Sequence, residues 1–374
     1  MGAGCAGLSL ALRLAEDPNY RGRVLLVDRR VEYRADRTWC FFHPLDSDLL
    51  PDAVIERQWQ WGRISNKDHQ VRLDFAHQPY TELSALSFYG SALERLTQDA
   101  RFSLAFGHSI DDSAISPRSD NTQVRIDGEV YETRWLIDSR HDGSLSQRDA
   151  ALWQVFMGFE LETETARFET SEAVLMDFLE EDAFPVSFLY LLPRSPHCAL
   201  MEYTVFSRSF IQPDQLEAAL RGVVRDRLEG LPYKILRTEA GVIPMGMQTG
   251  PSASPGWIEA GLLNGAARPS TGFAFLRIQR WSRECAKAIT QGACTPTVIR
   301  DPMMTSMMDG LFLKVLGNRH SRGADILTQL FKRTPTPSLV RFLNDEGNFI
   351  DHLKVIWAMP KIPFFRQLFA LLHP

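Results

Sequence analysis

The chain has 374 residues, of which 44% are hydrophobic and 23% are charged, and its formal net charge is −5 at pH 7. This is an ordinary globular composition, and the length suits two packed domains. A mildly acidic chain offers no overall basic surface, which excludes nucleic acid as the main partner. The five cysteines form no CxxC pair and the nine histidines lack metal-ligand spacing, so we expect reduced thiols and no metal site.

The chain opens with glycines in the spacing G-x-G-x-x-G, at Gly2, Gly4 and Gly7. In a dinucleotide-binding fold the first glycine allows a tight turn and the second lets the backbone approach a pyrophosphate. The third lets the following helix pack closely on the sheet. The first amides of that helix would face the anion, which makes Cys5 and Ala6 cofactor-binding candidates as well.

A second signal follows the glycines at the spacing that a dinucleotide site requires. Residues 23–28 read as a buried parallel strand ending in an acid, Asp28, which suits a carboxylate that binds a ribose hydroxyl. Arg29 adjoins it and joins the candidate site. A buried strand should also precede the glycines, but only Met1 does. We therefore expect the natural chain to begin several residues earlier.

Further along the chain the patterns alternate between strand and helix. We expect residues 37–42 to form a loop, and we expect a hairpin that turns at Asp127-Gly128. Residues 153–207 are rich in strand patterns, which is typical of a second domain with an antiparallel sheet. A second glycine-rich turn, at 261–272, precedes a helix over 272–289, and the remainder of the chain reads as helical.

The late turn supplies further cofactor candidates, Gly265, Thr271 and Gly272. A helix that begins just beyond it would point its N-terminus toward a flavin. Leu262 stands where many flavoproteins carry an acid, so the expected ribityl contact is missing.

The order of these elements predicts an α/β fold. It comprises a Rossmann-like, FAD-binding domain of the flavoprotein hydroxylase type, an inserted antiparallel-sheet substrate domain and a helical C-terminal region. We expect the FAD-binding domain to comprise 1–75, 120–150 and 235–300, the substrate domain 76–119 and 151–234, and the helical region 301–374.

The sequence resembles the bacterial lycopene cyclase family over nearly its whole length. The segments that carry the resemblance are 2–9, 38–41, 153–158, 176–177, 200–204, 239–246, 268–273, 308–312 and 341–343. The resemblance implies an isomerase that closes β-rings on linear lycopene, by way of γ-carotene, without net redox change. It further implies a non-covalent FAD that works in reduced form, with NAD(P)H as reductant.

Ring closure needs a proton donor, a pocket that excludes water and a surface that holds the polyene end. Glu202, in an otherwise apolar strand, matches the family's functional glutamate and is the first catalytic candidate. A surface acid on an alternating strand is the alternative. Asp177 is the second candidate, although it would equally suit a hydrogen bond to a loop. The residues leave open whether reduced flavin or Glu202 delivers the proton.

Aromatic residues in the matching segments could line the pocket and stabilise a cation through their faces. Each one is also a plausible core residue. The pocket candidates are Trp39, Phe41, Tyr190, Tyr203, Pro269 and Phe273.

A lycopene pocket should open toward a membrane because the substrate is insoluble in water. No apolar run reaches the roughly 18 residues of a spanning helix and no signal peptide is visible, so we expect a cytoplasmic protein with peripheral membrane contact. The region from 302 to 374 is basic and carries apolar stripes at 303–312 and 364–372. Both stripes could instead be core, and this reading is favoured for the methionine-rich first stripe.

Two other functions fit the same residues. An FAD-dependent monooxygenase or polyprenyl reductase of this fold would consume NAD(P)H in proportion to product. A carotenoid or flavin carrier would return its ligand unchanged. Fold alone does not decide between them.

Overall fold

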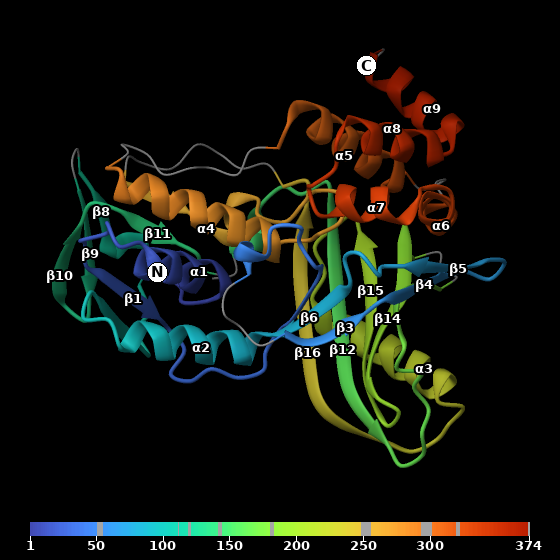
Figure 1. Cartoon of the computed structure of the whole chain (residues 1–374), viewed down its shortest axis with the longest axis horizontal. Helices are drawn as coiled ribbons and strands as arrows, with labels where there is room; N and C mark the ends of the chain where they lie inside the picture. Colours follow the sequence, from blue (N-terminus) through green and yellow to red (C-terminus); the bar gives the residue numbers. More distant parts are fainter. Residues whose placement is uncertain are drawn as a thin grey trace.

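The computed structural model describes residues 1–50, 55–110, 112–118, 121–140, 144–179, 183–247, 256–292, 301–318 and 322–372. The chain forms two adjoining lobes (Figure 1). One lobe packs α1, α2 and α4 around short parallel strands. The other is a large, mainly antiparallel sheet with the C-terminal helices above it and α3 below it. The predicted α/β class is confirmed.

The first lobe contains two parallel strand pairs that the N-terminal residues join. β1 (Val24–Asp28) pairs with β7 (Phe102–Phe106), and β11 (Leu136–Asp138) pairs with β17 (Trp257–Glu259). The amide of Gly2 donates to the Val27 carbonyl at 2.8 Å, and the Met1 amino group donates to the Ile137 carbonyl at 2.6 Å. The first two residues thus lie between β1 and β11, where the central strand of such a sheet belongs.

Helix α1 (Cys5–Glu16) is buried along most of its length because its sequence is almost wholly apolar. It packs between α2 (Ala85–Thr97) and α4 (Phe275–Thr290). A three-stranded antiparallel sheet of β8 (Ile115–Pro117), β9 (Thr122–Ile126) and β10 (Glu129–Thr133) completes the lobe. Its hairpin turns at Asp127 and Gly128, which have φ of 51° and 87°, as the sequence predicted.

The second lobe is built on a seven-stranded sheet in the order β16-β12-β15-β14-β13-β4-β5. Neighbouring strands are antiparallel except β13 and β4, which are parallel. The strands are β16 (Tyr233–Met245), β12 (Leu152–Thr163), β15 (Cys198–Ser207), β14 (Val186–Ser195), β13 (Glu172–Phe178), β4 (Trp61–Ser65) and β5 (Gln70–Asp74).

Each face of this sheet has its own apolar core. On the lower face, residues such as Val155, Met201 and Tyr203 pack against Leu220 and Val224 of α3 (Glu217–Arg227). On the upper face, apolar side chains of the sheet pack beneath the C-terminal helices. These helices are α5 (Met303–Leu316), α6 (Gly323–Arg333), α7 (Thr336–Leu343), α8 (Phe349–Ala358) and α9 (Lys361–Leu372). The alternation of side chains along a strand assigns each residue to one core or the other.

The lobes meet at a small antiparallel sheet in the order β2-β6-β3. It consists of β2 (Thr38–Phe42), β6 (Tyr80–Ser84) and β3 (Ile55–Trp59). Residues 37–42 were predicted as a loop, and that prediction is wrong for β2. The apolar run of Trp39, Phe41 and Phe42 forms a strand because it pairs with β6, a contact that distant residues provide.

Several strands lie in a different layer from the one expected. β7 pairs with β1, although 76–119 was expected beside the substrate sheet, and β4 and β5 join the large sheet, although 1–75 was expected in the other domain. β16 is an edge strand of the large sheet, although 235–300 was assigned elsewhere. An apolar pattern indicates a strand but does not say which sheet it joins. The division into domains stays a proposal.

A buried arginine ties the late turn to the helical region. Arg268 is 1% exposed and bonds Asp309 of α5 at 3.2 Å, Asp345 at 3.1 Å and the carbonyl of Phe342. Its guanidinium also lies 4.2 Å from the centre of the Phe342 ring.

We expect Arg268→Ala to lower the free energy of unfolding by about 3–5 kcal/mol, because it leaves the carboxylate of Asp309 buried without its cation. Urea unfolding followed by circular dichroism measures the loss. Arg283→Ala, which removes an exposed ion pair with Asp46, is the control and should change stability by about 1 kcal/mol or less. Equal effects of the two substitutions would contradict the anchoring role.

Candidate functional site

A cavity of about 1030 Å³ begins at the N-terminal glycines, and we call it the glycine-turn cavity. Gly2, with φ of 83°, and Gly4 line it with Cys5 and Ala6. Gly7 lies behind the turn, where any side chain would collide with the carbonyl of Gly2. Helix α1 has no side-chain cap and no acid in its first turn, so its first amides are available to an anion in the cavity.

Asp28 and Arg29 also line the glycine-turn cavity. The Asp28 carboxylate accepts hydrogen bonds from the amide of Ala3 at 2.7 Å and from Arg30, whose side chain binds both oxygens. Burial disfavours the charge, but these bonds outweigh it and hold the pKa of Asp28 below its usual value. Asp28 is therefore a fixed negative group at the end of β1.

The late turn forms another wall of the same cavity. Gly261, Gly265 and Gly272 have φ of 67°, 68° and 73°, which L-residues with side chains rarely adopt. Leu262, Thr271 and Gly272 line the cavity, whereas Gly265 ends the short helical turn at 261–264 and shapes the loop. Pro269 lies within the turn beside the buried Arg268.

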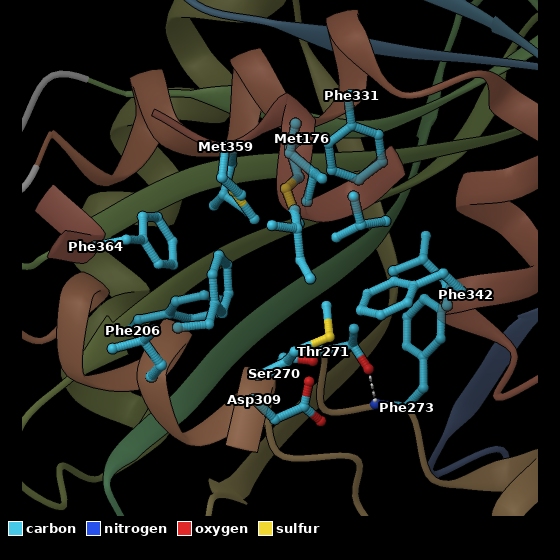
Figure 2. A pocket seen from close by; sticks show the side chains of 18 of the residues that line it. Met176, Phe206, Ser270, Thr271, Phe273, Asp309, Phe331, Phe342, Met359 and Phe364 are labelled. Carbon is cyan, nitrogen blue, oxygen red and sulfur yellow. Dashed lines mark hydrogen bonds between the residues drawn. The ribbon is translucent and has the colours of Figure 1, made fainter. Parts of the chain in front are cut away.

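A second cavity, of about 730 Å³, lies between the upper face of the large sheet and the C-terminal helices. We call it the apolar cavity. Figure 2 shows aromatic and methionine side chains that enter it from the sheet (Met176, Phe206), from the helices (Phe331, Phe342, Phe364) and from the segment after α8 (Met359). The late turn closes one end with Ser270, Thr271 and Phe273, where the Thr271 hydroxyl accepts a hydrogen bond from the Phe273 amide at 3.2 Å.

The two cavities share part of their walls. The residues that line both are Tyr80, Gln154, Tyr190, Glu202, Thr271 and Phe273. Glu202, the first catalytic candidate, thus lies where the glycine-turn cavity meets the apolar cavity. Its side chain is partly exposed, because it faces the cavities.

The surroundings of Glu202 favour its protonated form. Burial and the neighbouring carboxylate of Glu239 raise its pKa to about 8, and this outweighs the hydrogen bond from Thr204 and the nearby Arg237 and Arg37. Within the described part of the chain, its only hydrogen bond is from the Thr204 hydroxyl, at 3.3 Å. An acid in this state is poised to donate a proton near neutral pH.

Two tyrosines complete the junction. The hydroxyls of Tyr80 and Tyr190 lie 2.9 Å apart in a hydrogen bond, and the rings meet nearly edge to face. Burial raises the pKa of both hydroxyls well above the usual value, so both remain neutral. The carbonyl oxygen of the Gln154 side chain is buried at the same junction without a donor from the described residues.

The structure places two predicted site residues on the opposite face of the large sheet from Glu202. Tyr203 is 1% exposed in the lower core, because neighbouring residues of a strand point to opposite faces. Asp177 shares that face, since it pairs through Leu189 with Tyr203. There it accepts a hydrogen bond from Ser65 at 2.7 Å and binds Arg227 of α3. Both corrections follow from strand alternation.

The predicted aromatic residues divide between cavity and core. Tyr190 and Phe273 line both cavities and Trp39 lines the glycine-turn cavity. Phe41 is instead 2% exposed in the core around α1, stacked on Phe275 at 4.9 Å. Sequence reasoning missed Tyr80, Gln154 and Glu239. The alternation of side chains along a strand already predicts that Glu239 and Gly241 lie on the same face of β16. The position of Glu239 beside Glu202 depends instead on pairing with distant strands.

Solved structures show that this architecture is that of flavoprotein hydroxylases and their relatives. A geranylgeranyl bacteriochlorophyll reductase-like protein from Thermoplasma acidophilum aligns with a TM-score of 0.63 and 13% identity over 96% of this chain and 94% of its own. The halogenase PltM in complex with phloroglucinol and FAD aligns with a TM-score of 0.61 and 11% identity, over 92% of this chain and 81% of its own. The p-nitrophenol 4-monooxygenase PnpA from Pseudomonas putida aligns with a TM-score of 0.57 and 14% identity, over 95% of this chain and 96% of its own. At these identities the likeness shows the fold.

Comparison of the sequence with protein families identifies a narrower class of protein than the fold does. The family model described as lycopene cyclase protein matches residues 1–369, and the chain belongs to this family. No curated protein sequence matches the chain significantly. The resemblance inferred from the sequence is thereby confirmed.

The raised pKa of Glu202 has a consequence for stability. The folded protein holds this proton more tightly than the unfolded chain, whose carboxyl titrates near 4.5. The bound proton therefore contributes to the free energy of unfolding. This contribution is fully present below pH 4.5 and is lost as the pH rises through about 8. Between about pH 5 and about pH 9, we expect the wild type to lose a few kcal/mol of unfolding free energy relative to Glu202→Gln. Urea unfolding of both proteins across this range measures the difference, and parallel curves would contradict it.

Proposed function

We propose that this protein is a lycopene cyclase that converts lycopene, by way of γ-carotene, to β-carotene without net oxidation or reduction. The observation that carries the proposal is the position of Glu202, a protonated acid at the end of an apolar cavity, in a chain of the lycopene cyclase family. A water-insoluble polyene needs such a lining, and cyclisation needs such an acid.

The glycine-turn cavity fits FAD as its cofactor. The uncapped N-terminus of α1 suits the pyrophosphate, and the absence of a side chain at Gly4 keeps the approach to it open. Asp28 lies at the end of β1, where a ribose hydroxyl belongs. Gly2, Cys5, Ala6 and Arg29 line the same space, and Thr271 and Gly272 form the far wall. PltM, a protein of the same fold, binds FAD.

We further propose that the FAD is non-covalent and works in reduced form, with NAD(P)H as the reductant. Reduced FAD would supply electron density to stabilise positive charge beside the substrate. No electrons leave the cofactor overall, so NAD(P)H would be needed only to bring the enzyme into its working state.

The chain's own residues account for the proton balance. Glu202 donates a proton to C2 of the terminal C1=C2 double bond, which leaves a tertiary cation at C1. The C5=C6 π bond then attacks C1, the C1–C6 bond forms and the charge moves to C5. The carboxylate of Glu202 takes a proton from C6, which creates the ring double bond and restores the acid. One proton enters and one leaves, so the product is an isomer of the substrate.

The walls of the apolar cavity support these steps. Phe42, Phe273 and the two tyrosines present aromatic rings near Glu202, and such rings stabilise a cation by roughly 0.5–2 kcal/mol each. The apolar side chains also exclude water, which would otherwise capture the cation as an alcohol.

Expression of the chain in cells that accumulate lycopene, followed by pigment chromatography, tests the proposal. We expect lycopene to be replaced by γ- and β-carotene. Glu202→Gln should reduce ring formation at least a hundredfold, because an amide donates no proton to an alkene, while FAD binding stays intact. Glu162→Gln removes an exposed carboxylate from β12 and is the matched control. Wild-type turnover of Glu202→Gln would contradict the assignment.

A polyprenyl reductase or monooxygenase of the same fold is the alternative. The observation that favours it is the fold similarity to the geranylgeranyl bacteriochlorophyll reductase-like protein, since an apolar cavity would also suit a prenyl chain. Oxidation of NAD(P)H measured against product decides between them. A cyclase consumes far less than one equivalent, whereas a reductase consumes at least one.

We also propose that the protein works in the cytoplasm as a peripheral membrane protein. No helix in the described ranges has the length and apolar character to span a bilayer. Met307, Ile356, Phe365 and Leu368 line the apolar cavity and are also 67%, 40%, 56% and 43% exposed, so the cavity opens onto an apolar surface of α5, α8 and α9. Met303 of the methionine stripe, for which core packing was favoured, is 79% exposed.

This surface predicts that polar substitutions will weaken lipid binding. Trp357 and Phe369 are 75% and 62% exposed, and we expect Trp357→Asp with Phe369→Asp to lower the fraction bound to anionic liposomes at least tenfold in sedimentation. Val31→Asp is the control, since Val31 is 79% exposed on the other lobe. Equal loss in both variants, or none in either, would contradict the docking surface.

A further inference from the structure

Two glutamates face each other across a glycine on the upper face of the large sheet. Gly158 of β12 is in register with Glu202 of β15 on one side and with Glu239 of β16 on the other. Residues directly opposite in neighbouring strands point to the same face. A Cβ atom at Gly158 would lie 3.2 Å from Cγ of Glu202, so a side chain at this position would crowd Glu202.

Glu239 is held in place by an ion pair and hydrogen bonds. It is 4% exposed and accepts hydrogen bonds from the Thr38 hydroxyl and from Arg237, both at 2.6 Å. Arg237 is in turn fixed by Glu160 at 2.9 Å and by the carbonyl of Ala35 at 3.1 Å. Charge-assisted bonds of this kind fix the position and the orientation of the carboxylate.

Glu202 has no comparable support. The charged groups that act on it are Glu239 and Arg237 of β16 and the exposed Arg37 before β2. The other titratable groups facing it are Tyr190 of β14, Cys40 of β2 and Tyr80 of β6. Burial raises the pKa of these three groups well above their ordinary values, so they stay neutral. Glu239 is therefore the one anion that acts directly on Glu202 among these groups.

We propose that Glu239 is a positioning residue for the cyclisation, whose fixed carboxylate, across Gly158, keeps Glu202 in the protonated form that donates the proton. The proposal deepens the proposed function and rests on it for the reaction itself. Two neighbouring carboxyl groups disfavour double ionisation, and the ion pair with Arg237 belongs to Glu239, so Glu202 is the group that holds a proton.

The same pair favours completion of the cycle. When Glu202 gives its proton to the alkene, two carboxylates face each other across Gly158. Their repulsion makes Glu202 a stronger base at that moment than an isolated carboxylate, which helps it to take the proton from C6. Glu239 itself neither gains nor loses a proton.

The titration of Glu202 in the FAD-loaded protein tests the proposal without turnover. Infrared difference spectra across a pH series report its protonated carboxyl, identified as the band that Glu202→Gln removes. We expect a midpoint near 8 in the wild type and one lower by about one to two units in Glu239→Gln. The rate of cyclisation should fall by the same roughly ten- to hundredfold at alkaline pH and recover at acidic pH.

Two further variants sharpen the test. Glu160→Gln removes the other carboxylate bound to Arg237 and should move the midpoint by less than about half a unit. Glu239→Asp shortens the side chain by one methylene and so moves the carboxylate farther from Glu202. It should lower the midpoint of the Glu202 titration by less than Glu239→Gln does. It also serves as the readout if Glu239→Gln does not fold, as judged by bound flavin and thermal melting.

An unchanged midpoint in both Glu239 variants would overturn the proposal, as would a loss of activity by the same factor at every pH. A shifted midpoint in a protein that makes no ring would support the glutamate pair and count against the cyclase function. The two ideas can therefore fail separately.

Discussion

The pairing of β12 with β15 and β16 determines where the polar residues of the candidate site lie. It aligns Glu202, Gly158 and Glu239 on one face of the sheet. An alternating series of charges lies beside them, in which Arg194 and Arg237 both bind Glu160 and Arg237 also binds Glu239. Glu202 does not take part in this series of ion pairs. Its charged form is therefore less stable than that of Glu160, and its pKa is raised.

A second constraint joins the two lobes at the late turn. Arg268 binds Asp309 and Asp345 in the interior, and the turn that it anchors contributes Thr271 and Phe273 to both cavities. The same segment therefore shapes the wall of the glycine-turn cavity and the end of the apolar cavity.

Much of the fold could be read from local pattern. The glycine spacing, the strand ending at Asp28 and the Asp127-Gly128 turn depend on neighbours in sequence, and the structure contains each of them. Glu202 could be singled out because it is a carboxyl in an apolar strand and because it matches the functional glutamate of the family that the sequence resembles. The partners of Glu202 could not, since Glu239, Tyr80 and Gln154 approach it only through pairings between distant strands.

The errors have equally physical causes. Asp177 looked like Glu202 because both are acids in apolar strands, but the register puts Asp177 on the α3 face, where Arg227 neutralises it. Tyr203 adjoins Glu202 in sequence and therefore faces away from it. Residues 38–42 form a strand because β6 lies beside them. Pairing with distant strands decided the outcome for Asp177 and for residues 38–42, whereas the alternation of side chains along β15 decided it for Tyr203.

The arrangement of cavities also supports the proposed reaction, which involves no net redox change. A hydroxylase must bring oxygen and a polar ring to the flavin, whereas here the space beyond the junction is lined by phenylalanine, leucine and methionine. The titratable groups at the junction are Glu202, whose pKa is raised to about 8 by burial and by Glu239, and two tyrosines whose pKa burial raises well above the usual value. Such a site can hold a cation, give one proton and take one back, which is the whole of the chemistry that ring closure on a polyene requires.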